Sequence, residues 1–267
     1  MPASPHIQPL IIGAPYGNYI HFPGVTSTMG TFTAADRGGR PKALWRMLLT
    51  MRYYPRLNAW INKLGLPNPG IDWLVARVAS GKAQVADKLV SIHGFTPADW
   101  TVLLEKTAAL KPLAIELNMS CPNIGHIGWP DDLFAKAVAT GVPLVVKIPP
   151  INWEPMFEQA RAAGITHFHC CNTLPAPNKN PNKGGGISGR PLKGVSMQVI
   201  SQLRKRVDFS DLTIIGGGGV YEASDVDDYA NLGVRHVAIA SKLNNPKYLF
   251  SDAGIAGIRA RAKEKLG

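Results

Sequence analysis

The side chains best suited to chemistry stand together in the stretch NMSCPN, where a thiol lies between two amides. Cys121 is either a reactive group beside Asn118 and Asn123 or a small buried filler, because free cysteines are often found in cores. The remaining cysteines, Cys170 and Cys171, are adjacent within an apolar stretch. We therefore expect core packing for that pair, no disulfide framework and no metal site.

Short apolar stretches alternate with helix-like runs along the chain, and the strand-like stretches have the composition of strands covered on both faces. The expected strands cover residues 10–13, 24–28, 88–93, 113–117, 144–148, 167–171, 212–215 and 236–240. The expected helices cover residues 71–80, 97–110, 131–139, 154–163, 194–207 and 223–232. This alternation predicts an α/β fold, a (β/α)8 TIM barrel formed by residues 1–267 as one domain, with an open doubly wound sheet as the alternative.

The second unit interrupts this rhythm, since roughly sixty residues separate the strands near Val25 and Val90. We expect this insertion after strand two to build part of a binding site. Polar groups follow most of the predicted strands, and in a barrel those ends form the active face.

Two turns, one of them glycine-rich, indicate a phosphate site. IIGGGGV (214–220) follows the seventh predicted strand and IASK (239–242) follows the eighth. Glycines let backbone N–H groups approach a phosphate closely, and barrels commonly bind phosphate at these two strand ends. A plain tight turn is the alternative. A second glycine-rich stretch, residues 182–194, predicts a ligand-covering loop instead.

Composition limits the kinds of ligand, partner and location that we expect. The net charge of +11 favours anionic ligands, although a basic solvated surface with no specific partner explains it equally well. No apolar run approaches the ~20 residues that span a bilayer, and the first residues do not resemble a signal peptide. We expect a cytoplasmic protein with a small-molecule substrate, no membrane partner and no nucleic-acid partner; a homodimer is left open.

Six segments, spread over nearly the whole chain, carry a family resemblance. They are NKLGLPNPG, ELNMSCPN, VVKIPP, CNTL, GGGISGRPLK and IIGGGGV, in this order. With them the chain resembles the dihydroorotate dehydrogenase-type FMN flavoproteins, most closely their soluble, cysteine-using branch. The resemblance implies an oxidoreductase of pyrimidine biosynthesis that oxidises dihydroorotate or a related dihydropyrimidine, with hydride transfer to FMN.

The resemblance also implies roles for individual residues. Cys121 would be the catalytic base. The substrate-binding residues would be Asn62, Asn118, Asn123, Asn172 and Thr173. The cofactor-binding residues would be Ala14, Asn118, Lys147, Gly189, Gly217, Gly218, Gly219, Ala240 and Ser241.

One position departs from the family pattern. The family commonly has a Thr-Lys-Ser triplet at the end of strand two, whose lysine reaches flavin and substrate carboxylate, whereas this chain has Thr26-Ser27-Thr28. Either Lys63 or a basic residue of the segment 37–46 replaces that lysine, or the substrate lacks a carboxylate. Two further readings are a tRNA-dihydrouridine synthase-like flavoenzyme and a flavin-binding barrel without dihydroorotate activity.

Overall fold

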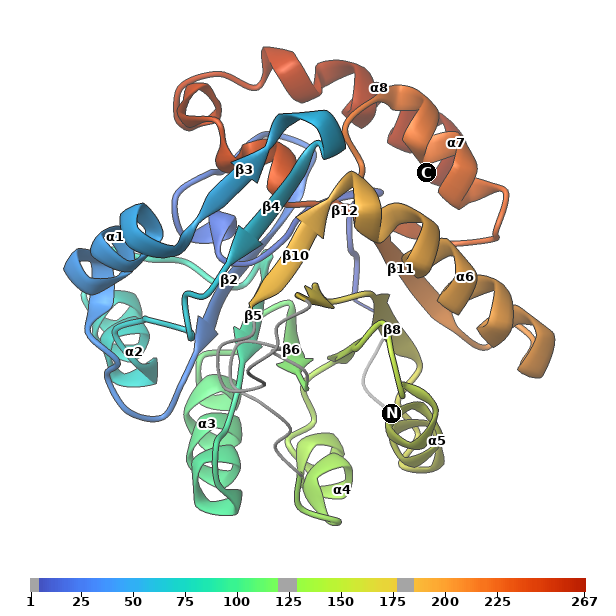
Figure 1. Cartoon of the computed structure of the whole chain (residues 1–267). Coiled ribbons are helices and arrows are strands. Elements are labelled where there is room, and N and C mark those ends of the chain that lie inside the picture. The colour runs from blue at the N-terminus through green and yellow to red at the C-terminus, as the bar shows by residue number, and fades with distance from the viewer. Residues whose placement is uncertain (1–4, 120–128, 177–184) are drawn as a thin grey trace.

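Eight parallel strands close into a barrel in the computed structural model, which describes residues 5–119, 129–176 and 185–267 (Figure 1). In order around the barrel these strands are β1 (Leu10–Ile12), β12 (His236–Ile239), β11 (Thr213–Gly217), β8 (His167–Cys170), β7 (Leu144–Ile148), β6 (Ala114–Asn118), β5 (Lys88–Ile92) and β2 (Thr26–Phe32). The predicted TIM barrel is confirmed, and the open-sheet alternative is wrong because β2 pairs with β1 to close the circle.

In the described part of the chain, seven helices pack around the barrel (Figure 1). They are α2 (Ile71–Ala79), α3 (Pro97–Ala109), α4 (Leu133–Ala139), α5 (Glu154–Ala162), α6 (Arg190–Arg206), α7 (Ala223–Ala230) and α8 (Ala256–Leu266). Helix α6 begins four residues before the predicted start at 194, since Pro191 fits a first helical turn. Short 3-10 helices cover η1 (Tyr16–Asn18), η2 (Pro55–Leu57), η4 (Ser241–Asn244), η5 (Pro246–Leu249) and η6 (Ala253–Ile255).

The insertion after β2 forms a small sheet together with the segment that follows β8. It contains α1 (Gly39–Thr50), β3 (Arg52–Tyr54) and β4 (Ala59–Asn62), and β4 pairs antiparallel with β10 (Gly186–Gly189), which also pairs with β9 (Leu174–Pro175). Figure 1 shows β3, β4 and β10 side by side in front of the barrel strands. The prediction of a covering loop at 182–194 is therefore wrong for the described part, which is strand and helix.

The second strand extends further than the sequence predicts. Its pairing with β5 shifts register between Met29 and Phe32, and Gly30 has a φ of 94° there. Such a bulge lets a strand continue past a glycine that otherwise resembles a turn. Ser27 consequently lies in the first half of β2, where its hydroxyl donates to the carbonyl of Ile20 at 3.1 Å. Its assignment to the strand end is wrong.

The barrel interior changes character along its axis. Its lower layer is apolar and consists of Ile7, Ile11, Leu89, Ala114, Val145, Ile215 and Ala238. Side chains alternate along each strand, so Glu116, Lys147 and His169 are the next inward positions of β6, β7 and β8 toward the carboxyl ends. The core between barrel and helices is apolar, which leaves the upper interior as the polar region. None of the helices described in this structure is long and apolar enough to cross a membrane.

Candidate active site

A cavity of about 560 Å³ opens at the carboxyl ends of the barrel strands. Several strands and the insertion contribute polar side chains to its lining: Thr31 from β2, Asn62 from β4, Asn118 from β6, Lys147 from β7, and Asn172 and Thr173 after β8. These residues are more than 140 positions apart in the chain, and only the closed barrel with its small sheet brings them together.

A chain of hydrogen bonds sets the orientation of the amides. The Asn172 amide donates to Asn118 Oδ1 at 2.8 Å, and the Asn118 amide donates to Thr31 Oγ1 at 2.9 Å. The Thr31 hydroxyl in turn lies 3.0 Å from Ser91 Oγ on β5. The Thr173 backbone N–H donates to Asn172 Oδ1 at 2.9 Å. Each amide is therefore held in one orientation at the edge of the cavity, where amide groups suit a flat ligand rich in carbonyl groups.

The opposite wall of the cavity is apolar. Phe32 and Trp73 lie with ring centroids 6.3 Å apart, and Leu64, Leu66 and Met47 extend this surface. Apolar walls with a few convergent polar groups are typical of small-molecule sites.

A smaller cavity of about 110 Å³ adjoins the first and is lined by the glycine turn. Gly218 and Gly219 have φ values of 117° and 67°, which other residues rarely adopt. A Cβ on Gly218 would lie 2.7 Å from Leu192 Cγ, so α6 packs directly against this turn. Gly217, Ala240 and Ser241 complete this wall, and Ala14, Lys147, Asn172 and Thr173 line both cavities.

Gly189 lies next to the same turn without lining either cavity. Its carbonyl oxygen would be 3.2 Å from a Cβ on Gly219, and its own φ is 96°. Two predicted residues, Cys121 and Asn123, lie outside the described residues. Every other predicted site residue lies at or beside these two adjoining cavities.

Beneath the cavities lies a buried, hydrogen-bonded pair, Glu116 and His169, that sequence reasoning missed. His169 Nδ1 is 2.8 Å from Glu116 Oε2, and both side chains are almost wholly buried. Burial by itself would raise the pKa of Glu116, but the charge of Lys147 and the hydrogen bond from His169 outweigh it and lower the pKa to about 2. Burial and Lys147 lower the pKa of His169. The available signal was strand alternation, since Glu116 points inward whenever Asn118 does.

Of the basic residues expected to reach the site from the insertion, Arg37 and Arg46 have contacts outside the cavity, and the side chains of Arg40 and Lys42 lie outside the described part. Arg37 donates to the Gly65 carbonyl at 3.2 Å and lies over the Phe95 ring, while Arg46 lies beside Gly65. Lys63 packs against Gly185 instead of lining the cavity. Among the side chains described here, Lys147 and Arg77 are the cations that line it.

Three further residues have structural roles. Asn68 accepts hydrogen bonds from the backbone N–H groups of Thr33 and Gly70, so it holds a turn while touching the cavity. Cys170 and Cys171 are buried, as predicted, although Cys171 also contacts the smaller cavity.

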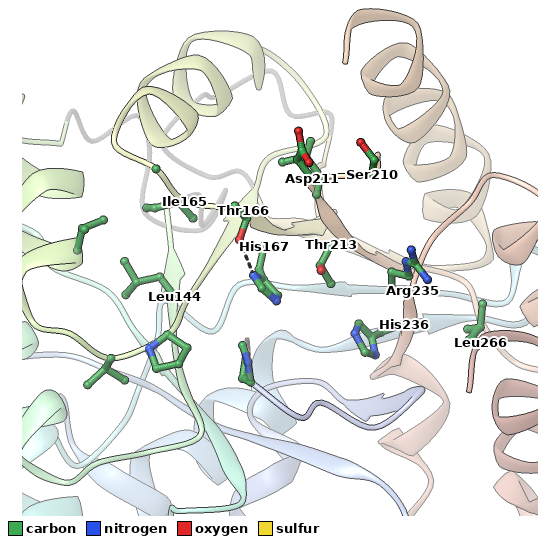
Figure 2. A pocket seen from close by; sticks show the side chains of 16 residues that line it. Leu144, Ile165, Thr166, His167, Ser210, Asp211, Thr213, Arg235, His236 and Leu266 are labelled. Atoms are coloured by element: carbon green, nitrogen blue, oxygen red, sulfur yellow. Dashed lines mark hydrogen bonds between the residues drawn. The ribbon is translucent and has the colours of Figure 1, made fainter. Parts of the chain in front are cut away.

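Another cavity, of about 500 Å³, lies at the opposite end of the barrel. Figure 2 shows it lined by the first residues of strands, among them Leu144, His167, Thr213 and His236. Its contacts are local: Thr166 Oγ1 lies 3.0 Å from His167 Nδ1, and His236 Nδ1 lies 3.0 Å from the Gln8 carbonyl. Since barrel enzymes carry their chemistry at the other end, we regard the cavity at the carboxyl ends as the candidate active site.

Comparison with known proteins agrees with this geometry. A family model described as dihydroorotate dehydrogenase matches residues 25–252. The chain belongs to the dihydroorotate dehydrogenase family. The catalytic subunit of dihydroorotate dehydrogenase B (NAD(+)) from Latilactobacillus sakei is 31% identical over 204 residues, 68% of this chain and 66% of that protein. The corresponding subunit from Oceanobacillus iheyensis is 34% identical over 215 residues, 70% of this chain and 67% of that protein.

Members named for a different electron acceptor are equally similar. Dihydroorotate dehydrogenase A (fumarate) from Lactobacillus helveticus is 31% identical over 205 residues, 68% of this chain and 66% of that protein. The match thus spans just under two thirds of the length of these relatives. Among solved structures, ligand-free DHODH from Eimeria tenella superposes with a TM-score of 0.69 at 18% identity, covering 90% of this chain and 76% of that chain. That likeness supports the dihydroorotate dehydrogenase fold.

Proposed function

We propose that this protein is an FMN-dependent oxidoreductase that oxidises dihydroorotate or a related dihydropyrimidine. The observation that carries the proposal is the row of oriented amides, Asn172 to Asn118 to Thr31, beside Lys147 and the glycine turn. Family membership and relatives named dihydroorotate dehydrogenase support it. A cytoplasmic location and a homodimer remain expectations from the sequence.

The residues at the two adjoining cavities fit FMN. Backbone N–H groups of Gly217–Gly219, with Ala240 and Ser241, would hold its phosphate, because this turn tolerates no Cβ and leaves the backbone open to an anion. Ala14, Asn118, Lys147 and Gly189 are the other proposed contacts of the cofactor. When bound, FMN accepts a hydride from the substrate.

The chain itself supplies binding, orientation and a base. Asn62, Asn118, Asn172 and Thr173 would hold the substrate ring, with Asn123 as a further proposed contact. Cys121 follows β6 by three residues and would remove the proton from the ring carbon next to the one that loses the hydride. A thiol with an ordinary pKa of about 8.5 is mostly protonated at neutral pH, so the rate should rise with pH until the thiolate predominates.

The end of β2 bears on which dihydropyrimidine is the substrate. Gly30, Thr31 and Phe32 line the cavity there, and a Cβ on Gly30 would lie 2.3 Å from the Ser91 carbonyl oxygen. The backbone at Gly30 therefore excludes a side chain, and none of the three residues offers a cation for a substrate carboxylate. A substrate without a carboxylate should therefore be tested beside dihydroorotate. Dihydrouracil serves for this, because it has the same ring without the carboxylate.

Flavin binding and substrate oxidation are tested separately. The purified protein should carry or take up FMN, seen as a flavin absorbance spectrum. Anaerobic mixing with dihydroorotate or dihydrouracil should then bleach that spectrum, and Cys121→Ala should slow the bleaching without preventing FMN binding. If neither compound bleaches the flavin, the proposed oxidation is contradicted and a flavin-binding barrel without this activity is favoured. If Cys121→Ala bleaches as fast as the wild type, Cys121 is not the catalytic base.

A further inference from the structure

The ionic layer beneath the active-site cavity is formed by Glu116, Lys147 and His169, which occupy three adjacent strands. The Glu116 and His169 side chains are 1% and 4% exposed. A buried ion pair is weak evidence for stability, because well-packed apolar side chains often serve as well or better. The lower barrel layer shows that apolar packing is available to this fold. The charged layer therefore calls for a functional explanation.

The two ring nitrogens of His169 face different surroundings. Nδ1 is bound to Glu116, whereas Nε2 points to the glycine turn, since a Cβ on Gly217 would lie only 2.7 Å from it. His169, Gly217 and Lys147 line the same small cavity. Within the described part of the chain, Nε2 has no hydrogen-bond partner. It therefore lies next to the turn that the proposed function assigns to the cofactor.

The carboxylate determines what Nε2 can offer. Glu116 is ionised throughout the physiological range because its pKa is lowered to about 2, so it only accepts hydrogen bonds and Nδ1 carries a proton. Nε2 of the neutral ring is then an acceptor, and it becomes a donor only when His169 is protonated. Burial and the Lys147 charge lower the pKa of His169, which keeps the ring neutral without a ligand, while Glu116 acts against them.

We propose that His169, held by Glu116, binds an anionic group of the flavin cofactor through Nε2 and takes up one proton from solvent as it does so. An anion next to Nε2 would add to the negative charge of Glu116, and two neighbouring negative charges favour the protonated form of the ring. The anionic group is either the phosphate or the flavin ring in its reduced state. The titratable groups that act on His169 from neighbouring strands of the described chain are Glu116 on β6 and Lys147 on β7. The inference rests on the proposed function insofar as the ligand is FMN.

The test measures FMN and riboflavin affinity from flavin fluorescence between pH 5.5 and 8.5. The variants are His169→Asn and Glu116→Gln, and the matched control is His167→Asn, which lies two residues away on the same strand and lines the cavity at the opposite barrel end. If the phosphate is the partner, His169→Asn should weaken FMN binding by about tenfold or more at neutral pH, flatten its pH dependence and leave riboflavin unaffected. Glu116→Gln should act in the same direction, because it removes the charge that favours protonated His169.

The reduced ring is distinguished by the midpoint potential of bound FMN. If the ring is the partner, FMN affinity changes little, but the potential of the wild-type and His167→Asn proteins should fall more steeply with pH than that of His169→Asn. Thermal unfolding of each variant identifies any loss due to misfolding, and Glu116→Gln provides the second reading if His169→Asn does not fold.

If both folded variants keep the FMN affinity, the pH dependence and the midpoint potential of the wild type, the inference is wrong. The proposed function would be unaffected by that result. Failure of the wild-type protein to bind FMN at all would instead refute the proposed function.

Discussion

Asn118 is the residue on which most contacts of the site converge. Its side-chain oxygen accepts from Asn172, its amide donates to Thr31, and its backbone carbonyl lies 2.7 Å from His93 Nδ1. Truncation would remove two hydrogen bonds at once, those to Asn172 and to the buried Thr31, which is more costly than the loss of one exposed contact.

Asn118→Ala should therefore lower kcat/KM for the dihydropyrimidine by roughly 10- to 100-fold, equivalent to about 1–3 kcal/mol of transition-state binding. Asn231→Ala, at the end of α7, is the matched control and should keep wild-type kinetics. Steady-state assays with the FMN-loaded proteins measure both. An Asn118→Ala enzyme with wild-type kcat/KM would show that the amide row does not bind the substrate.

The buried histidines give the molecule a pH-dependent stability. His167 has its pKa lowered to about 4 by burial and by His236, so the unfolded chain binds a proton there at pH values where the folded protein does not. The resulting stability is present above the ordinary pKa of about 6.5 and is lost as the pH falls toward 4. The lowered pKa values of His169 and Glu116 act in the same direction.

We expect the free energy of unfolding to fall between pH 6.5 and 4, with about 3 kcal/mol due to His167. Urea unfolding at several pH values measures it, and His167→Asn should show a smaller fall than the wild type. Equal pH dependence in both proteins would mean that His167 has the same pKa in the folded and unfolded states.

At the scale of elements, the turn after β11 and the helix α6 offer a matched pair of glycines. A methyl group on Gly217 would lie 2.7 Å from His169 Nε2, whereas one on Gly194, within α6, meets nothing within 4 Å. Gly217→Ala should weaken FMN binding by about tenfold or more, because either the ring or the turn must move. Gly194→Ala should leave FMN binding unchanged and raise stability by about 0.5–1 kcal/mol. FMN titration and urea unfolding give both readings.

Helix α3 shows how well local signals predict an element. Thr96 and Asp99 form a capping box at its start, with Asp99 N–H donating to Thr96 Oγ1 at 3.1 Å, and Pro97 occupies the first helical turn. Thr96→Ala should lower the free energy of unfolding by about 1 kcal/mol and leave FMN affinity unchanged. A loss of FMN affinity would indicate that α3 is coupled to the site.

The second strand shows where sequence reasoning failed. Met29-Gly30 resembles a strand end, but the bulge at Gly30 carries β2 on to Phe32 and removes Ser27 from the site. The small sheet was also missed, because β3, β4 and β10 are only three or four residues long, and β4 pairs with β10 across more than 120 positions of the chain. Local patterns carry no information on such pairing.

For the whole molecule, the alternation of strands and helices was sufficient to predict the barrel and the face on which its polar residues converge. The place of the glycine turn could be predicted because strand order fixes it, whereas the roles of the amides were implied by the family resemblance. The Glu116–His169 pair could not, since a glutamate and a histidine 53 positions apart become neighbours only once β6, β7 and β8 are side by side. The structure thus adds the charged layer under the cavity to the site inferred from sequence.

The central claim is that this barrel oxidises a dihydropyrimidine through bound flavin. Its most direct test is anaerobic stopped-flow mixing of the FMN-loaded protein with dihydroorotate and, separately, dihydrouracil, followed at the visible flavin absorbance. We predict rapid bleaching by at least one of them, faster as the pH rises toward about 8.5 and strongly slowed in Cys121→Ala. A flavin spectrum that neither compound changes at any pH would contradict the claim.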